Sequence, residues 1–216
     1  MLKDLIYKEL RLSAHPGEWA FLLLAALLLI PQWLYYIAFI YIFILVMIIV
    51  QTDKANSDLV FVTLLPVRKK DIVTARTWTI VGYELAYILV AAVCALVRLR
   101  FYPENNATSM NTNFAFFGTA FLTYAIFNAI FVPGSYKKPY RMLWPLPGGA
   151  VISIVVAAVL NTLPLVIPAV SKLLNDTRLG HLPYQLAALL VGLAAFAGAT
   201  IWANRKAAAN FEMVDL

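Results

Sequence analysis

Long apolar segments separated by short polar ones run through the whole chain. A helix needs about 20 apolar residues to cross the hydrocarbon core of a bilayer, and six segments approach that length. The pattern predicts an all-α integral membrane protein, a single transmembrane domain over residues 1–216. Pro31 leaves only a short connection between the first two spans, so they should form a tight hairpin. The six predicted spans cover residues 15–30, 33–50, 78–97, 114–132, 148–170 and 184–203.

The composition supports this class of protein. The chain is 62% hydrophobic and 13% charged, whereas a soluble globular domain has about 45–50% apolar and about 25% charged residues. The net charge of +6 is therefore assigned to basic loops that face anionic lipid headgroups, and nucleic acid is not expected as a partner. Cys94 is the single cysteine, so we expect neither an intrachain disulfide nor a cysteine-based metal site.

Most of the positive charge lies in alternate connections between the apolar segments. With the N-terminus inside, thirteen Lys and Arg residues fall in inner segments and four in outer ones. Cytoplasmic loops carry an excess of these residues. Both termini are therefore predicted in the cytoplasm, together with the loops 51–77 and 133–147 and the tail 204–216. An odd number of spans would put Arg205 and Lys206 outside. We expect a multi-pass protein of a bacterial cytoplasmic membrane.

The fifth apolar segment carries Asn161, Pro164 and Pro168 in its second half. An interior proline removes a backbone donor and kinks or breaks a helix. The helix proper is therefore predicted over residues 148–160. The following stretch, within residues 161–183, would be a re-entrant or surface piece, which is tolerated at membrane depth only where protein buries it.

Residues 1–14 have the pattern of an amphipathic helix. Leu2, Leu5, Ile6, Leu10 and Leu12 gather on one side of a helical wheel. We expect an interfacial elbow helix that lies along the inner leaflet before the first span. Glu9 projects from the middle of the apolar side, where an unpaired carboxylate is costly. It either contacts a partner subunit or an inner-loop cation, or it reaches the headgroup region from a tilted helix.

The loop 51–77 predicts a second short helix on the cytoplasmic side. Ser57 or Asp58 can cap it through a side-chain oxygen, and Pro66 ends it. Basic residues beginning with Arg68 then lead into the third span. A solvated linker does not need so many apolar residues, and exposed apolar residues in this number indicate a docking surface. These residues are Leu59, Val60, Phe61, Val62, Leu64 and Leu65.

With this loop, the chain resembles the membrane-spanning subunits of type-2 ABC transporters, in the branch of small six-helix permeases that includes the phenol-soluble-modulin exporters. The similar pieces are Leu5-Ile6-Tyr7-Lys8-Glu9-Leu10, the predicted helix at Asp58, Leu64-Leu65-Pro66-Val67-Arg68-Lys69-Lys70-Asp71-Ile72-Val73 and Ala75-Arg76. The resemblance implies that residues 57–65 form a coupling helix seated in a cleft of a separate ATPase subunit, and that residues 161–183 form small gate helices. The residues it assigns to ATPase coupling are Ser57, Asp58, Leu59, Phe61, Val62, Leu65, Pro66 and Arg68.

The same resemblance sets the expected partners and cargo. The chain has no Gly-x-x-x-x-Gly-Lys-Ser/Thr phosphate-binding loop, so ATP and Mg²⁺ would be bound by the partner ATPase and the chain itself would hold no cofactor. Two copies, or this chain and a paralogue, would enclose the pathway. The implied function is ATP-driven export of a hydrophobic or amphipathic substrate such as a peptide.

Glu84 is the one acidic residue placed well inside a predicted span. An ionisable group at that depth is a candidate functional site, either for a cationic substrate group or for a proton. Alternatively, it hydrogen-bonds a neighbouring side chain for structure. Two other functions stay open: a membrane scaffold or immunity protein that transports nothing, and a membrane-embedded enzyme. The enzyme is disfavoured, because such enzymes cluster His, Asp or Glu near one membrane face.

Overall fold

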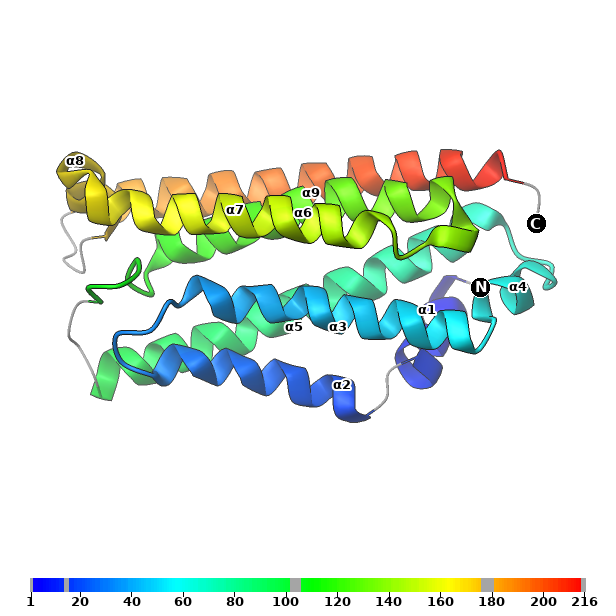
Figure 1. The fold of residues 1–216 in the computed structure, drawn as a ribbon, viewed down its shortest axis with the longest axis horizontal. Coiled ribbons are helices and arrows are strands. Elements are labelled where there is room, and N and C mark those ends of the chain that lie inside the picture. Colours follow the sequence, from blue (N-terminus) through cyan, green and yellow to red (C-terminus); the bar gives the residue numbers. More distant parts are fainter. Residues whose placement is uncertain (1, 14–15, 102–105, 176–180, 215–216) are drawn as a thin grey trace.

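The computed structural model describes residues 2–13, 16–101, 106–175 and 181–214, and every regular element in these ranges is helical. The long helices lie side by side in one elongated bundle (Figure 1). Five of the described helices are long and apolar enough to cross a membrane. They are α3 (Tyr36–Ala55), α5 (Lys69–Phe101), α6 (Phe114–Lys137), α7 (Pro145–Val166) and α9 (Leu182–Glu212).

The first predicted span is shorter and more tightly wound than an ordinary membrane helix. It consists of α2 (Pro16–Ala20) and a 3₁₀-helix, η2 (Phe21–Leu29), which runs antiparallel to α3 and packs against α5 (Figure 1). Three residues per turn place every third side chain on one face, and Leu22, Ala25 and Leu28 are the buried ones. The expected tight hairpin follows, with Gln32 at a φ of 54° in the turn before α3.

The predicted break near residue 160 is wrong. α7 continues through Pro164 to Val166 and ends at Ile167, whose backbone is extended at φ −105° and ψ 107°. The residue before a proline is driven out of the helical region, so Pro168 ends the helix two residues earlier, at Val166. Two single turns follow, α8 (Pro168–Val170) and η4 (Ser171–Asn175). The rest of the predicted 161–183 segment includes residues 176–180, which lie outside the described part.

Aromatic side chains fill the centre of the bundle. Phe39 of α3 lies 5.2 Å from Phe116 and 6.1 Å from Tyr124 of α6, measured between ring centroids. Phe43 stacks on Phe127 at 4.3 Å. All of these rings are buried. The interior of the single chain is therefore a packed core.

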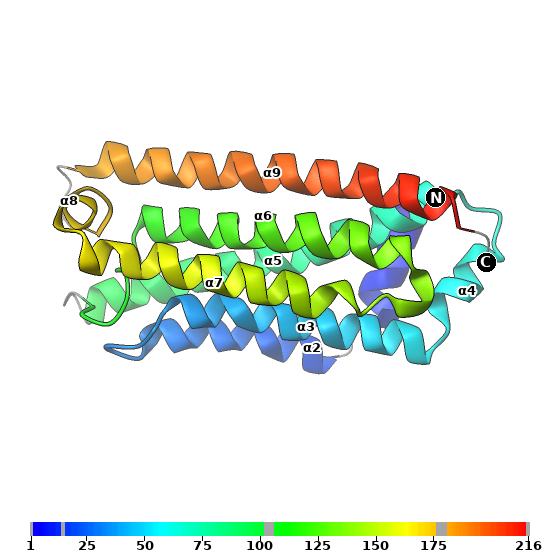
Figure 2. The ribbon, with the colours of Figure 1, turned by 45° about the horizontal axis from the view of Figure 1, so that its top comes forward.

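Helices α6 and α9 approach each other so closely at two glycines, Gly118 and Gly192, that no larger residue would fit at either position. A Cβ atom on Gly118 would lie 2.5 Å from the carbonyl oxygen of Ala188, and one on Gly192 would lie 2.3 Å from the carbonyl oxygen of Gly118. Both obstacles are backbone atoms. Small residues at such crossings are a common way for membrane helices to pack, and Figure 2 shows α9 lying along α6 over much of its length.

We expect Gly192→Ala to destabilise this pair of helices. The added methyl group must push two backbones apart, and overpacking of this kind costs about 1–3 kcal/mol. Gly198→Ala on the same helix is the matched control, because nothing lies within 4 Å of its Cβ position. The control should be neutral or gain stability from helix propensity. Thermal unfolding of the purified chain in detergent measures both, and equal melting temperatures for the two variants would contradict the prediction.

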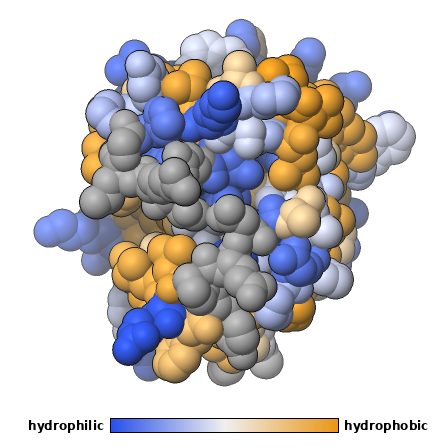
Figure 3. All heavy atoms as spheres, turned by 90° about the vertical axis from the view of Figure 1, so that its left-hand side faces the viewer, coloured by the Kyte–Doolittle hydropathy of each residue, from blue (hydrophilic) through white to orange (hydrophobic). Residues whose placement is uncertain are grey.

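The end of the bundle away from the chain termini is tied together by amide side chains. Asn106 donates from Nδ2 to the carbonyl oxygen of Trp33 at 2.7 Å. Asn111 donates from Nδ2 to the carbonyl oxygen of Asn175 at 2.9 Å, and Asn113 donates to that of Leu174 at 2.6 Å. Hydrophilic surface gathers at this end among apolar patches (Figure 3). Residues 106–113, in the connection between α5 and α6, thus join the 30–35 turn to η4. Residues 102–105 of the same connection lie outside the described part.

Candidate functional site: a short helix held by an ionic cluster

The short helix α4 (Asp58–Thr63) lies at the end of the bundle that also carries both chain termini (Figure 1). Ser57 precedes it with φ 51° and ψ 31°, and its carbonyl oxygen accepts the first helical hydrogen bond from Phe61 N at 3.1 Å. The predicted side-chain cap is wrong, because Ser57 makes no capping hydrogen bond. The left-handed residue instead turns the chain sharply from α3 into α4. The helix ends at Thr63, two residues before the expected Leu65.

Helix α4 has two different faces. Val62 is 1% exposed and packs into the bundle, and Leu59 is half-buried against the same core. Phe61 and Leu64 are 61% and 80% exposed on the other side. Val60, Leu65, Pro66 and Arg68 are also exposed. The apolar residues predicted to form a docking surface therefore divide into an inward pair, Leu59 and Val62, and an outward apolar surface, which we call the α4 surface: Val60, Phe61, Leu64 and Leu65. Phe61 and Leu65 of this surface are also among the residues predicted to couple to an ATPase.

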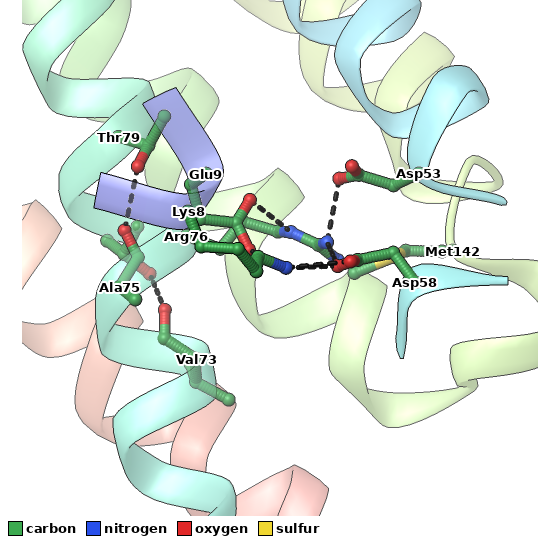
Figure 4. A network of polar contacts seen from close by, with 10 residues as sticks. Lys8, Glu9, Asp53, Asp58, Val73, Ala75, Arg76, Thr79 and Met142 are labelled. Carbon is green, nitrogen blue, oxygen red and sulfur yellow. Dashed lines mark hydrogen bonds and ion pairs between the residues drawn. The ribbon is translucent and has the colours of Figure 1, made fainter. Parts of the chain in front are cut away.

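Arg76 of α5 lies buried behind α4, with carboxylates of three other elements around its guanidinium group (Figure 4). Its Nη2 lies 2.7 Å from Asp53 Oδ2 and 3.1 Å from Asp58 Oδ2. Its Nε lies 3.6 Å from Glu9 Oε2. Its Nη1 faces Met142 Sδ at 3.7 Å. One side chain thus contacts α3, α4 and the N-terminal segment.

Lys8 completes this ionic cluster, which we define as Lys8, Glu9, Asp53, Asp58 and Arg76. Its Nζ donates to both carboxylate oxygens of Asp58 at 2.7 Å and lies 3.0 Å from Glu9 Oε1. Two cations therefore face three carboxylates. Lys8 ends α1 (Leu2–Lys8), and Glu9 begins the π-helical turn η1 (Glu9–Ser13). Because Glu9, Asp53 and Arg76 are almost fully buried, water screens their interactions little.

The sequence did not reveal this arrangement. Glu9 was expected to need a partner, and the structure places it against Lys8 and Arg76. Asp58 was one of two candidates for the helix cap, with Ser57, whereas its carboxylate points to Lys8 and Arg76. Asp53 was not singled out. The sequence does place Asp53 shortly after one apolar span and Arg76 just before the next. Charge and spacing alone, however, do not show that these two residues pair.

Arg68 lies outside the ionic cluster. Its Nε lies 2.9 Å from Asp71 Oδ2 at the start of α5, and its side chain is 81% exposed. The hydrogen bond with Asp71 raises the pKa of the Arg68 guanidinium. Arg68 therefore adds a fixed positive charge beside the α4 surface.

Glu84 is fully buried in the middle of the bundle, away from the ionic cluster. Asn128 of α6 donates from Nδ2 to Glu84 Oε2 at 2.9 Å, and the same nitrogen lies 3.4 Å from Thr200 Oγ1 of α9. Three helices meet at these polar side chains. The contact is a hydrogen bond to a neighbouring side chain, which is the structural alternative that the sequence allowed for.

We expect Asn128→Leu to lower stability by about 1–3 kcal/mol, because it leaves a buried carboxyl group without its donor. Replacing both partners by apolar residues of similar size can be nearly neutral. The double variant Glu84→Leu/Asn128→Leu should therefore recover most of the loss. Thermal unfolding in detergent measures both, and a double variant less stable than Asn128→Leu would contradict this account.

The charged side chains of the site attach α4 to the bundle. Among the described residues, no three His, Cys, Asp or Glu side chains form a group that could hold a metal ion. The carboxylates of the ionic cluster face a guanidinium and an ammonium group. What the site offers is an exposed apolar surface on a helix that buried charges hold against the bundle.

These features define a multi-pass membrane protein with a short helix at one end that exposes apolar side chains. The family model described as ABC-2 family transporter protein matches residues 4–204, so the chain belongs to that family. It is a membrane-spanning permease subunit of an ABC transporter, a class that works with an ATPase subunit. The prediction of a type-2 ABC permease is thereby confirmed at the level of the family. No curated protein and no solved structure matches the chain.

Proposed function

We propose that the chain is the permease subunit of an ABC exporter and that α4 is the coupling helix that docks into a separate ATPase subunit. The observation that carries this proposal is the α4 surface. Phe61 and Leu64 protrude from a helix that is otherwise held to the bundle. Apolar side chains in such number at a polar end of a membrane protein favour a protein partner. The partner would bind ATP and Mg²⁺.

The proposed topology has six spans, with both termini and α4 in the cytoplasm and residues 2–13 as an elbow helix on the inner leaflet. We count α2 and η2 together as the first span because the 3₁₀ winding of η2 makes the segment longer than an α-helix of the same number of residues. A 3₁₀-helix rises about 2.0 Å per residue against about 1.5 Å in an α-helix. The five and nine residues therefore extend about 25 Å, close to the hydrocarbon thickness of about 30 Å. The excess of Lys and Arg at the α4 end supports the orientation in a bacterial cytoplasmic membrane.

The proposed pathway lies between two permease chains, either two copies or this chain and a paralogue. The support is the packed interior of the single chain, where Phe39, Phe116 and Tyr124 leave the centre filled. The cargo class is a hydrophobic or amphipathic molecule such as a peptide, as in the phenol-soluble-modulin exporters that the sequence resembles. Turns α8 and η4, at the end away from α4, would form part of the gate.

Affinity purification of the tagged chain from its native membrane tests this function. We expect an ATP-binding subunit to accompany it, and the complex in lipid nanodiscs to hydrolyse ATP faster when an amphipathic helical peptide is added. Recovery of the folded chain without a nucleotide-hydrolysing subunit would refute the proposal. ATP turnover that no apolar or amphipathic peptide changes would refute the cargo class alone.

A further inference from the structure

We propose that the ionic cluster makes α4, the N-terminal segment 2–13 and α5 one moving unit, with Asp58 and Arg76 as the positioning residues that pass a displacement of α4 to the other two. The inference rests on the proposed function, because it takes α4 as the helix that a nucleotide-driven subunit moves. It adds a route by which that movement enters the membrane-spanning bundle.

The covalent connections of α4 are poorly suited to this task. On one side the chain turns at Asn56 and Ser57, where the backbone leaves the helical region. On the other side residues 64–68 are not helical. A push on α4 would bend these two joints before it moved α3 or α5. The noncovalent attachment of its inner face must therefore carry the displacement.

That attachment is made mainly by Asp58, with Val62 one turn further on the same face. The Asp58 carboxylate lies 2.7 Å from Lys8 Nζ and 3.1 Å from Arg76 Nη2. Residues four apart lie on one side of a helix, so Asp58 and Val62 face inward while Phe61 and Leu64 face outward. A partner that grips the outer face would pull directly on the carboxylate of the inner face (Figure 4).

The charges make this attachment stiff. A guanidinium group presents its donors in a fixed planar fork, and Arg76 contacts Glu9, Asp53 and Asp58 at once. The cluster has two cations for three carboxylates, so the loss of any single contact leaves a carboxylate without sufficient positive charge. Uncompensated charge in a buried site is strongly unfavourable. The least costly response to a displaced α4 is movement of the whole cluster together with its helices.

Hydrogen–deuterium exchange of backbone amides tests this unit, first on the full-length chain alone in nanodiscs. Asp58→Asn keeps the size of the side chain and removes its charge. We expect exchange to rise about tenfold in both 58–63 and 2–13, the factor that corresponds to loss of a close charge pair at the low end of measured coupling energies. Asp71→Asn is the matched control, because Asp71 pairs with Arg68 outside the cluster. A rise confined to 58–63, or an equal rise in the control, would overturn the inference.

The second measurement uses the complex with its ATPase, trapped with ATP and vanadate. In the wild type, trapping should slow exchange in 58–63 and in 2–13 together. In Asp58→Asn the response of 58–63 should persist while that of 2–13 falls about tenfold. Persistence of both responses, or loss of both, would overturn a transmitting role. No response anywhere in the wild type would refute the proposed function, while the chain-alone measurement would still decide whether the unit exists. Lys8→Met is the second variant if Asp58→Asn does not fold.

Discussion

Replacing Arg76 by methionine should lower the free energy of unfolding by about 3–5 kcal/mol, the usual cost of removing one partner from a buried ion pair. The effect should be large because three carboxylates lose their shared cation and only Lys8 remains to balance them. Chemical or thermal unfolding of the purified chain in detergent, followed by tryptophan fluorescence, measures it. Arg76→Lys should fall between methionine and the wild type, since an ammonium group restores the charge but not the fork.

Arg68→Met is the matched control for this measurement. It removes the same kind of side chain from the same end of the bundle, but Arg68 is 81% exposed and forms its ion pair with nearby Asp71. Its loss should change stability little, as is usual for an exposed pair. If both substitutions lowered the free energy of unfolding by a similar amount, the ionic cluster around Arg76 would not be a special source of stability.

Phe61→Asp should weaken binding of the partner ATPase by at least about 30-fold, because central aromatic anchors of interfaces contribute about 2 kcal/mol or more. Phe61 is 61% exposed in the free chain, so the substitution should leave folding and membrane insertion unchanged. Leu64→Asp should act in the same way. The binding constant of the two subunits in nanodiscs and the peptide-stimulated ATP turnover of the mixture are the measurements.

Met213→Asp provides the corresponding control. Met213 is 77% exposed and lies at the C-terminal end of α9, at the same end of the bundle as α4. Like Phe61→Asp, this substitution replaces an exposed apolar side chain with an acidic one. Binding should be retained in this variant. Unchanged coupled turnover in both Phe61→Asp and Leu64→Asp would show that α4 does not dock the ATPase.

Hydropathy located the long helices well because the requirement for an apolar surface in a bilayer leaves few alternatives. The wrong predictions concern where a helix ends and how tightly it is wound, which depend on local backbone chemistry. The helix was expected to end at residue 160 because of the prolines that follow, yet α7 continues through Pro164 to Val166, because a surrounding bundle tolerates one missing hydrogen bond. The segment before Pro31 was expected to be an ordinary span, and its 3₁₀ winding is not encoded in hydropathy.

The α4 surface was accessible to sequence reasoning, whereas the ionic cluster was not. Apolar residues in a basic loop, predicted to be cytoplasmic, are visible in the sequence itself. The partners of Arg76 come from residues 9, 53 and 58, and only the packing of four elements brings them together. Sequence reasoning could say that Glu9 and Glu84 needed partners, because an isolated buried charge is costly. It could not name Arg76 or Asn128 as those partners.

The contact between Gly118 and Gly192 restricts how the molecule can deform. With the Gly118 carbonyl this close to the Gly192 backbone, sliding or rotation of α9 against α6 would bring main-chain atoms into collision, so these two helices should travel as a pair in any alternating-access cycle. The seam between α3 and α6 is different, because Phe39, Phe43 and Tyr124 meet there through side chains that can change rotamer. When the transporter opens and closes, α3 would therefore slide against α6 at these aromatic contacts, while α6 and α9 keep their positions relative to each other.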